Sequence, residues 1–194
     1  MKSKLILITG GARSGKSDYA QARAESISGK HCFLATCPVI DSEMDARIAR
    51  HKADRDQAIW QTIEEELDLV GVIRSLKSDT ICLLDCVTLW VNNLTYQAER
   101  ANIKFSEDEM TAKAVELTQQ AKEFQGTLIC VTNEVGMGVV PDNASARHYR
   151  DLVGRTNRII AAAADEVILV SCGLPLFLKN NSDLYNPLPV REPI

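Results

Sequence analysis

The sequence lacks the features that mark several broad classes of protein. No stretch rich in lysine and arginine stands out, and the formal net charge is −4 over 194 residues, which disfavours a nucleic-acid partner. No apolar run approaches the roughly 20 residues that span a bilayer. The first strand-like run begins too close to Met1 to leave room for a signal peptide. We therefore expect a cytoplasmic protein without a membrane span.

Cys-x-x-Cys pairs are also missing. The six cysteines lie in or beside apolar, strand-like segments, at Cys32, Cys37, Cys82, Cys86, Cys130 and Cys172. We expect buried, reduced thiols rather than zinc ligands or disulfides. The sequence shows no internal repeat and no low-complexity tract. Its length suits one compact domain over residues 1–194, with an irregular tail over 180–194.

One motif is complete. Residues 10–17 read GGARSGKS and fit the phosphate-loop pattern G-x-x-x-x-G-K-[ST] at every fixed position. The apolar residues 5–8 predict a buried parallel strand before the loop, and residues 18–25 are rich in helix formers. The glycines would let backbone N–H groups face phosphate oxygens, while Lys16 would reach the outer phosphates and Ser17 a Mg²⁺ ion. The motif therefore predicts binding of a nucleoside triphosphate.

Strand and helix patterns alternate along the rest of the chain. Apolar runs predict strands over 31–35, 60–63, 80–85, 127–132 and 166–170. Helical patterns cover 42–55, 67–76, 107–124 and 143–164. This order predicts a doubly wound α/β fold, in which helices flank a mostly parallel sheet and ligands bind outside the carboxyl ends of the strands.

Polar side chains follow two of the buried strands. Asp85 ends one of them, where an acid commonly holds Mg²⁺, although a capping or turn role is the alternative. Asn133 and Glu134 follow another and lead into a loop with two glycines. There Glu134 could orient a nucleophile or a metal-bound water, and a capping role is equally compatible with its position. Asp165 and Glu166 precede their strand, so we expect structural roles for them.

His51 lies in a charged helical stretch. Arg47, His51 and Arg55 are four residues apart, so they share one helix face. The neighbouring positive charges disfavour imidazolium and leave a neutral, nucleophilic ring near pH 7. The same arginines could neutralise a triphosphate. On spacing alone, a solvated charged face is the competing interpretation and the favoured one.

Further segments extend the pattern beyond these motifs. They are 35–37 (ATC), 41–51 (DSEMDARIARH), 60–64 (WQTIE), 83–94 (LLDCVTLWVNNL), 131–141 (VTNEVGMGVVP), 147–157 (RHYRDLVGRTN), 161–167 and 173–176 (GLPL). With the phosphate loop, they make the chain resemble the bifunctional adenosylcobinamide kinase/adenosylcobinamide-phosphate guanylyltransferase family of cobalamin biosynthesis. The resemblance covers roughly residues 4–179 in the same order.

The resemblance implies two activities on one substrate. ATP or GTP would phosphorylate the aminopropanol hydroxyl of adenosylcobinamide. GMP from GTP would then pass to that phosphate through a covalent intermediate on His51, releasing pyrophosphate and giving adenosylcobinamide-GDP. Mg²⁺ would accompany the nucleotide, with no permanently bound cofactor. The resemblance also implies a recombinase-type P-loop NTPase core and a homotrimer with sites near the subunit interfaces.

Nucleotide contacts are carried over from the family position by position. They fall on Thr9, Gly10, Gly11, Ala12, Arg13, Ser14, Gly15 and Lys16, on Ala35, Thr36 and Cys37, on Lys52, Ala53, Asp54 and Arg55, and on Glu64 and Asp85. The motif adds Ser17. A carboxylate at Glu64 or Asp85 could accept the N1–H and N2–H₂ donors of guanine. For Asp85 this competes with a role beside Ser17 as a Mg²⁺ ligand.

Two other functions are compatible with the motifs alone. One is a small-molecule P-loop kinase without guanylyltransferase activity, in which His51 is only a surface residue. The other is a nucleotide-gated regulatory protein with negligible transfer activity. The charged segment around His51 argues mildly against the second.

Overall fold

The computed structural model describes residues 4–38 and 58–180. Within these residues, seven strands form one sheet in the order β3-β2-β4-β5-β1-β6-β7. All neighbouring pairs are parallel except β6 and β7, which are antiparallel. The strands are β1 (Lys4–Thr9), β2 (Lys30–Ala35), β3 (Trp60–Glu64), β4 (Thr80–Asp85), β5 (Thr127–Val131), β6 (Glu166–Ser171) and β7 (Leu174–Lys179).

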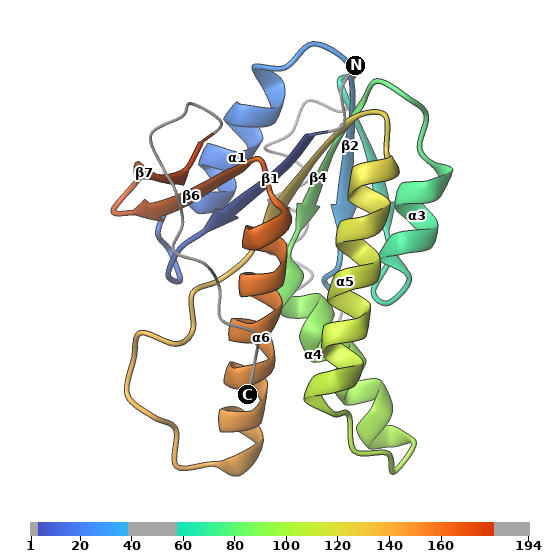
Figure 1. The fold of residues 1–194 in the computed structure, drawn as a ribbon. Helices are drawn as coiled ribbons and strands as arrows, with labels where there is room; N and C mark the ends of the chain where they lie inside the picture. The colour runs from blue at the N-terminus through green and yellow to red at the C-terminus, as the bar shows by residue number, and fades with distance from the viewer. Residues whose placement is uncertain (1–3, 39–57, 181–194) are drawn as a thin grey trace.

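Helices cover both faces of the sheet (Figure 1). They are α1 (Lys16–Glu25), α3 (Leu69–Ser75), α4 (Val87–Arg100), α5 (Glu107–Glu123) and α6 (Ala144–Ala163). Alternate strand residues enter two separate cores, as the period of two requires. On β1, Leu5 and Leu7 pack with α3 to α6, whereas Ile6 and Ile8 pack with α1. The lower parts of α4, α5 and α6 extend past the carboxyl ends of the parallel strands (Figure 1).

The predicted fold class is confirmed. Each predicted strand is present, and the helices predicted over 67–76, 107–124 and 143–164 match α3, α5 and α6. Clear start signals explain this success for two of them: Ser106 and Glu109 form a capping box before α5, and the Asn143 side chain caps α6. The helix predicted over 42–55 lies outside the described residues, as do residues 181–194 of the predicted tail.

The sequence analysis did not predict two of the elements, α4 and β7. Cys86, the residue immediately before α4, makes no side-chain capping bond, so the sequence lacks the usual signal for the start of a helix there. β7 contains Pro175, which ordinarily argues against a strand. The strand is tolerated because β7 lies at the edge of the sheet, where one side of the backbone needs no partner strand.

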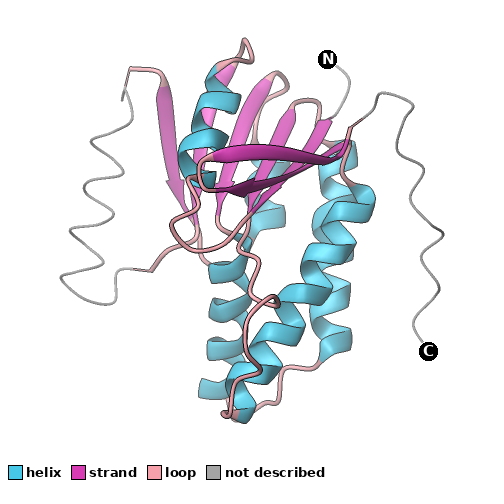
Figure 2. Cartoon of the chain, turned by 90° about the vertical axis from the view of Figure 1, so that its left-hand side faces the viewer, coloured by secondary structure: helices cyan, strands magenta, loops and turns pink. Residues whose placement is uncertain are grey.

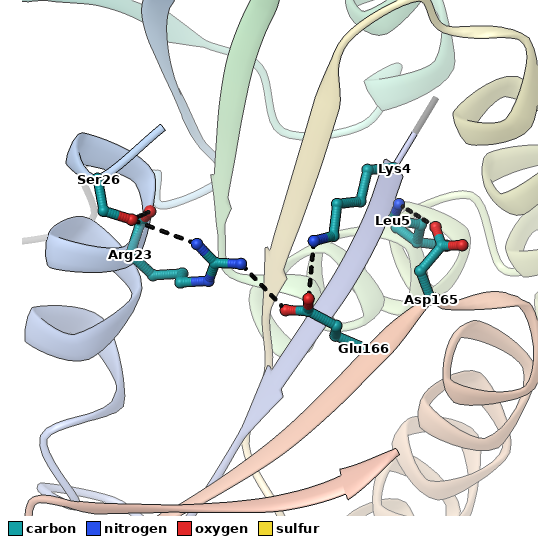
Figure 3. A network of polar contacts seen from close by, with 6 residues as sticks. All are labelled: Lys4, Leu5, Arg23, Ser26, Asp165 and Glu166. Atoms are coloured by element: carbon teal, nitrogen blue, oxygen red, sulfur yellow. Dashed lines mark hydrogen bonds and ion pairs between the residues drawn. The ribbon is translucent and has the colours of Figure 1, made fainter. Parts of the chain in front are cut away.

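The acids at the start of β6 have the structural roles predicted for them (Figure 3). Asp165 accepts a hydrogen bond from the backbone N–H of Leu5 at 2.8 Å. Glu166 accepts from Lys4 at 2.7 Å and from Arg23 at 3.3 Å. Burial alone would raise the pKa of Glu166, but the two cations outweigh it and hold the pKa below its ordinary value. These contacts tie β6 to β1 and α1.

The prediction of buried thiols is correct for four cysteines and wrong for Cys172. All six cysteines are free, and Cys32, Cys82, Cys86 and Cys130 are buried, while Cys37 is half-buried. Cys172 is exposed because it occupies the turn between β6 and β7, with a φ of 53°. In the described ranges, none of the helices combines the length and the apolar character needed to cross a bilayer.

Candidate nucleotide site

The phosphate loop connects the carboxyl end of β1 to the start of α1. Gly15, immediately before the helix, has a φ of 86°, and no side chain caps the first turn of α1. The leading N–H groups of a helix have no partners within the helix. Together with the positive end of the helix dipole, they form an anion-binding position. The structure therefore has the strand, loop and helix that the motif requires.

The loop packs tightly against the β6–β7 hairpin. A Cβ atom at Gly10 would lie 2.4 Å from the carbonyl oxygen of Val170, so only glycine fits there. The backbone N–H of Gly173 donates to the carbonyl oxygen of Ser14 at 2.9 Å. Gly173 has a φ of 78° and forms the hairpin turn with Cys172. The hairpin turn thus braces the phosphate loop just before α1 begins.

Lys16 is folded back onto the loop. Its Nζ donates to the carbonyl oxygen of Gly11 at 3.1 Å. Ser17 follows in the first turn of α1 and is partly exposed. The hydroxyl of Ser14 is buried inside the loop and has no hydrogen-bond partner among the described residues. Gly11, Ala12 and Arg13 are exposed, so the outer side of the loop is open to a ligand.

Strand register brings three of the predicted contact residues to one level. Ala35 of β2 is aligned with Glu64 of β3 on one side and with Asp85 of β4 on the other. Residues aligned in a parallel sheet point to the same face, and Ala35 packs with the α1 core. Glu64 and Asp85 therefore flank Ala35 on the α1 face, at the carboxyl edge of the sheet.

Thr36 joins the ends of β2 and β4. Its hydroxyl donates to the carbonyl oxygen of Cys86 and accepts from the backbone N–H of Cys86, both at 2.8 Å. Its backbone N–H donates to the carbonyl oxygen of Asp85 at 3.3 Å. Asn93 of α4 donates to the carbonyl oxygen of Thr36 at 2.8 Å. The predicted contacts at Thr36 and Asp85 are thus held together by backbone bonds.

The buried thiol of Cys86 is influenced by charged groups of the site. The pKa of Cys86 is raised to about 11, mainly by burial and then by the charge of Asp85, against smaller lowering effects from hydrogen bonds and from the charge of Lys16. The phosphate-loop lysine and the acid at the end of β4 therefore both act on one thiol. Thr88 lies 2.9 Å from this sulfur through its Oγ1, and Tyr149 of α6 donates to the Thr88 carbonyl oxygen at 3.1 Å.

The sequence analysis did not identify Thr88 and Tyr149 as residues of the site. They are separated by 61 residues and meet only in the folded chain, so no local pattern predicts their contact. Burial and the nearby Cys86 thiol raise the pKa of Tyr149 to about 12, so its hydroxyl stays protonated and can donate. Both residues lie in segments that resemble the family, which was the available hint.

Glu134 stabilises the turn that follows it, and its alternative role in orienting a nucleophile or a metal-bound water stays a prediction. Its carboxylate accepts from the backbone N–H of Gly136 at 2.7 Å. Its own N–H donates to the carbonyl oxygen of Gly10 at 3.1 Å. Glu134 therefore fixes the start of the loop after β5 and joins it to the phosphate loop.

The predicted catalytic residue and one group of predicted contacts cannot be placed. His51, Lys52, Ala53, Asp54 and Arg55 lie outside the described residues. Arg47 is outside them as well.

Oxygen donors suited to Mg²⁺ are present at the two expected positions. Ser17 lies in the first turn of α1, and Asp85 is the last residue of β4. Across 4–38 and 58–180, no three His, Cys, Asp or Glu side chains gather as a metal site. Protein-bound Mg²⁺ commonly uses one or two protein oxygens and completes its shell with phosphates and water. The chemistry of Ser17 and Asp85 therefore fits a metal that enters with the nucleotide.

The sequence matches a known enzyme family over most of its length. A family described as cobinamide kinase / cobinamide phosphate guanyltransferase matches residues 6–178. The bifunctional adenosylcobalamin biosynthesis protein CobU of Escherichia coli (strain K12) is 37% identical over 182 residues, covering 90% of this chain and 99% of that protein. The protein of the same name from Salmonella typhimurium is 39% identical over 183 residues, with the same coverage. Pseudomonas aeruginosa CobP is 39% identical over 174 residues, 89% of this chain and 96% of its own length.

The fold also resembles that of a solved ATPase from the type III secretion system of pathogenic bacteria. The TM-score is 0.58 at 12% sequence identity. The match covers 90% of this chain but only 57% of the ATPase chain. At this identity the likeness supports the P-loop NTPase-like fold and nothing about substrates.

Proposed function

This chain belongs to the cobinamide kinase / cobinamide phosphate guanyltransferase family, and from that premise we propose that both reactions take place at the carboxyl edge of its sheet. Family membership makes the protein a bifunctional enzyme of adenosylcobalamin biosynthesis. The observation that supports this location is the strand register, which aligns Glu64, Ala35 and Asp85 with one another. They lie at the carboxyl edge of the sheet, where the phosphate loop also lies.

For the kinase step, the substrates are adenosylcobinamide and ATP or GTP. The backbone of the phosphate loop and the first turn of α1 would bind the phosphates, and Lys16 would leave Gly11 to neutralise the outer ones. Ser17 and Asp85 would hold Mg²⁺, which when bound would neutralise phosphate charge. The product is adenosylcobinamide phosphate.

For guanylyl transfer, His51 is the proposed nucleophile. A ring nitrogen of His51 would form a bond to the α-phosphorus of GTP as pyrophosphate leaves. An oxygen of adenosylcobinamide phosphate would then attack the same phosphorus, and the ring would leave to give adenosylcobinamide-GDP. Such covalent catalysis divides one difficult displacement into two easier ones. Arg47, Lys52 and Arg55 would stabilise the charge on the phosphorus oxygens.

Guanine recognition is best assigned to Glu64. Its carboxylate can accept two hydrogen bonds from N1–H and N2–H₂ of guanine. Asp85 is the less suitable of the two acids, because in the sheet β4 lies closer than β3 to β1, whose carboxyl end leads into the phosphate loop. The remaining predicted contacts, Lys52, Ala53, Asp54 and Arg55, would bind the sugar or phosphates.

The proposal is tested by incubating the enzyme with GTP labelled at the α-phosphorus. We expect a protein-bound label that is labile in acid and stable in alkali, as a phosphoramidate is, and that is absent from His51→Ala. The alanine variant should still phosphorylate adenosylcobinamide with ATP. An unlabelled wild-type protein with kinase activity would instead support a simple kinase, and indifference to cobinamide would support a regulatory protein.

Assembly and location are further parts of the proposal. We propose a homotrimer, as the family resemblance implies, and we place its contacts at β7, which exposes apolar side chains at the sheet edge, with Leu174 exposed by 72%, Leu176 by 58% and Phe177 by 52%. Figure 2 looks onto this edge, and β7 lies in front of the other strands there. The six free thiols support a cytoplasmic location. We also propose that residues 1–194 act as one domain.

A further inference from the structure

The amide of Asn133 is a polar group at the edge of the site to which the proposed mechanism gives no role. Its Oδ1 is buried and has no hydrogen-bond partner in the described part of the chain. The same holds for the hydroxyls of Thr9 and Ser14, but a hydroxyl can rotate and act as donor or acceptor. An amide oxygen can only accept. Unpaired buried acceptors are costly and rare, so this one calls for a partner.

Contacts on both sides of Asn133 hold the amide in place. Its Nδ2 donates to the hydroxyl oxygen of Thr88 at 3.2 Å. Its backbone carbonyl oxygen accepts from the side chain of Asn157 at 3.1 Å, and Asn157 in turn accepts from Thr132 at 2.7 Å. With Nδ2 bonded to Thr88, Oδ1 is the amide atom left without a partner. The contacts to Thr88 and Asn157 fix the position of Asn133 at the end of β5.

Asn133 lies between the phosphate loop and the end of β4. The next residue, Glu134, donates its N–H to the carbonyl oxygen of Gly10 at 3.1 Å. On the other side, Thr88 is 2.9 Å from the sulfur of Cys86, the residue that follows Asp85 at the end of β4. The amide thus lies among the groups that would surround the outer phosphates of a bound nucleotide.

We propose that Asn133 Oδ1 binds the hydroxyl group that accepts the phosphoryl group in the kinase reaction. This inference rests on the proposed function. The hydroxyl hydrogen bonds to Oδ1, which orients the hydroxyl oxygen toward the terminal phosphorus. That oxygen forms the new bond to phosphorus, and the bond from phosphorus to the bridging oxygen breaks. Its electron pair leaves with the nucleoside diphosphate, and the hydroxyl proton passes to an oxygen of the transferred phosphoryl group.

The contribution of Asn133 is orientation, because an amide is not a base at neutral pH. Holding a nucleophile in line lowers the entropic part of the barrier. In the structure, Lys16 is bonded to Gly11 inside the loop. The substrate hydroxyl would reach the covered oxygen in the nucleotide-bound state, in which Lys16 has left Gly11 for a phosphate.

The test compares Asn133→Ala and Asn133→Asp with Asn92→Ala, an exposed asparagine on α4, as the matched control. Three quantities are measured on the full-length enzyme: kcat and KM for adenosylcobinamide with saturating ATP, labelling of His51 by GTP alone, and thermal unfolding. We expect Asn133→Ala to lower the kinase kcat by about tenfold or more, the loss of one well-placed hydrogen bond. Labelling of His51 should stay within about twofold.

The aspartate variant preserves shape and an acceptor oxygen but loses the N–H donor to Thr88 and adds a negative charge. At saturating ATP its kcat should therefore lie between those of the alanine variant and the wild type, and it replaces the alanine variant if that does not fold. A kinase kcat within twofold of wild type in folded Asn133→Ala overturns the proposal. Equal losses of kinase activity and labelling overturn it too, as does an aspartate variant no better than alanine. Absence of both activities from the wild type would refute the proposed function itself.

Discussion

Among single residues, Lys16 carries the charge on which binding of the outer phosphates depends most. We expect Lys16→Ala to lower the kinase kcat/KM by about 100-fold or more, because a charged anchor is lost where phosphate charge must be stabilised. Lys30→Ala, an exposed lysine at the opposite end of the sheet, is the matched control. Steady-state kinetics with both substrates measure the effect. Wild-type kinetics in the Lys16 variant would refute its role.

Glu166 tests the electrostatics of a structural residue. Its pKa is lower in the folded chain, so its ionised form stabilises the fold above its unfolded pKa of roughly 4.3. That stability is lost as the pH falls through the lower, folded pKa. Glu166→Gln should therefore lower the free energy of unfolding by about 1 kcal/mol at pH 7. This loss should become progressively smaller as the pH falls below about 4.

The measurement for Glu166 is denaturant unfolding at several pH values. Glu123→Gln, an exposed glutamate at the end of α5, is the control and should show almost no change. A difference between Glu166→Gln and wild type that stays constant from neutral to acid pH would contradict the assigned ion pairs with Lys4 and Arg23.

At the scale of elements, the β6–β7 hairpin links the sheet edge to the phosphate loop. Gly173 has a left-handed φ of 78°, and a Cβ there would meet no atom within 4 Å, so Gly173→Ala adds backbone strain without a clash. We expect a loss of about 1–2 kcal/mol in unfolding free energy and a higher KM for ATP, because the Gly173–Ser14 bond braces the loop. Gly138→Ala, also in open space but without positive φ, should not be destabilised in this way.

The hairpin and α4 also show where prediction from sequence stopped. Strands such as β4 and β5 were predictable because their apolar runs are continuous, and α5 because it has a capping box. β7 was not, since its stability comes from pairing with β6 at an edge that tolerates Pro175. Of the site, the phosphate loop and Asp85 were predictable from local pattern. The bond between Asn133 and Thr88 joins residues 45 apart, and only strand order brings them together.

At the scale of the whole molecule, the exposed face of β7 predicts how chains associate. Leu176→Lys should weaken the oligomer, because a charge would enter an apolar interface. Ile103→Lys, at the same 58% exposure but on the turn after α4, is the control and should leave assembly unchanged. Sedimentation velocity measures the oligomer. A Leu176→Lys protein that remains a trimer would place the interface elsewhere.

The central claim is that one edge of the sheet brings nucleotide phosphates and the His51 ring together. The most direct measurement is a crystal structure with Mg²⁺ and a GTP analogue that cannot be hydrolysed. We predict that the β- and γ-phosphates lie in the loop of residues 10–16, with a ring nitrogen of His51 about 3–3.5 Å from the α-phosphorus. A structure in which the ring of every subunit stays far from any α-phosphorus would contradict the claim.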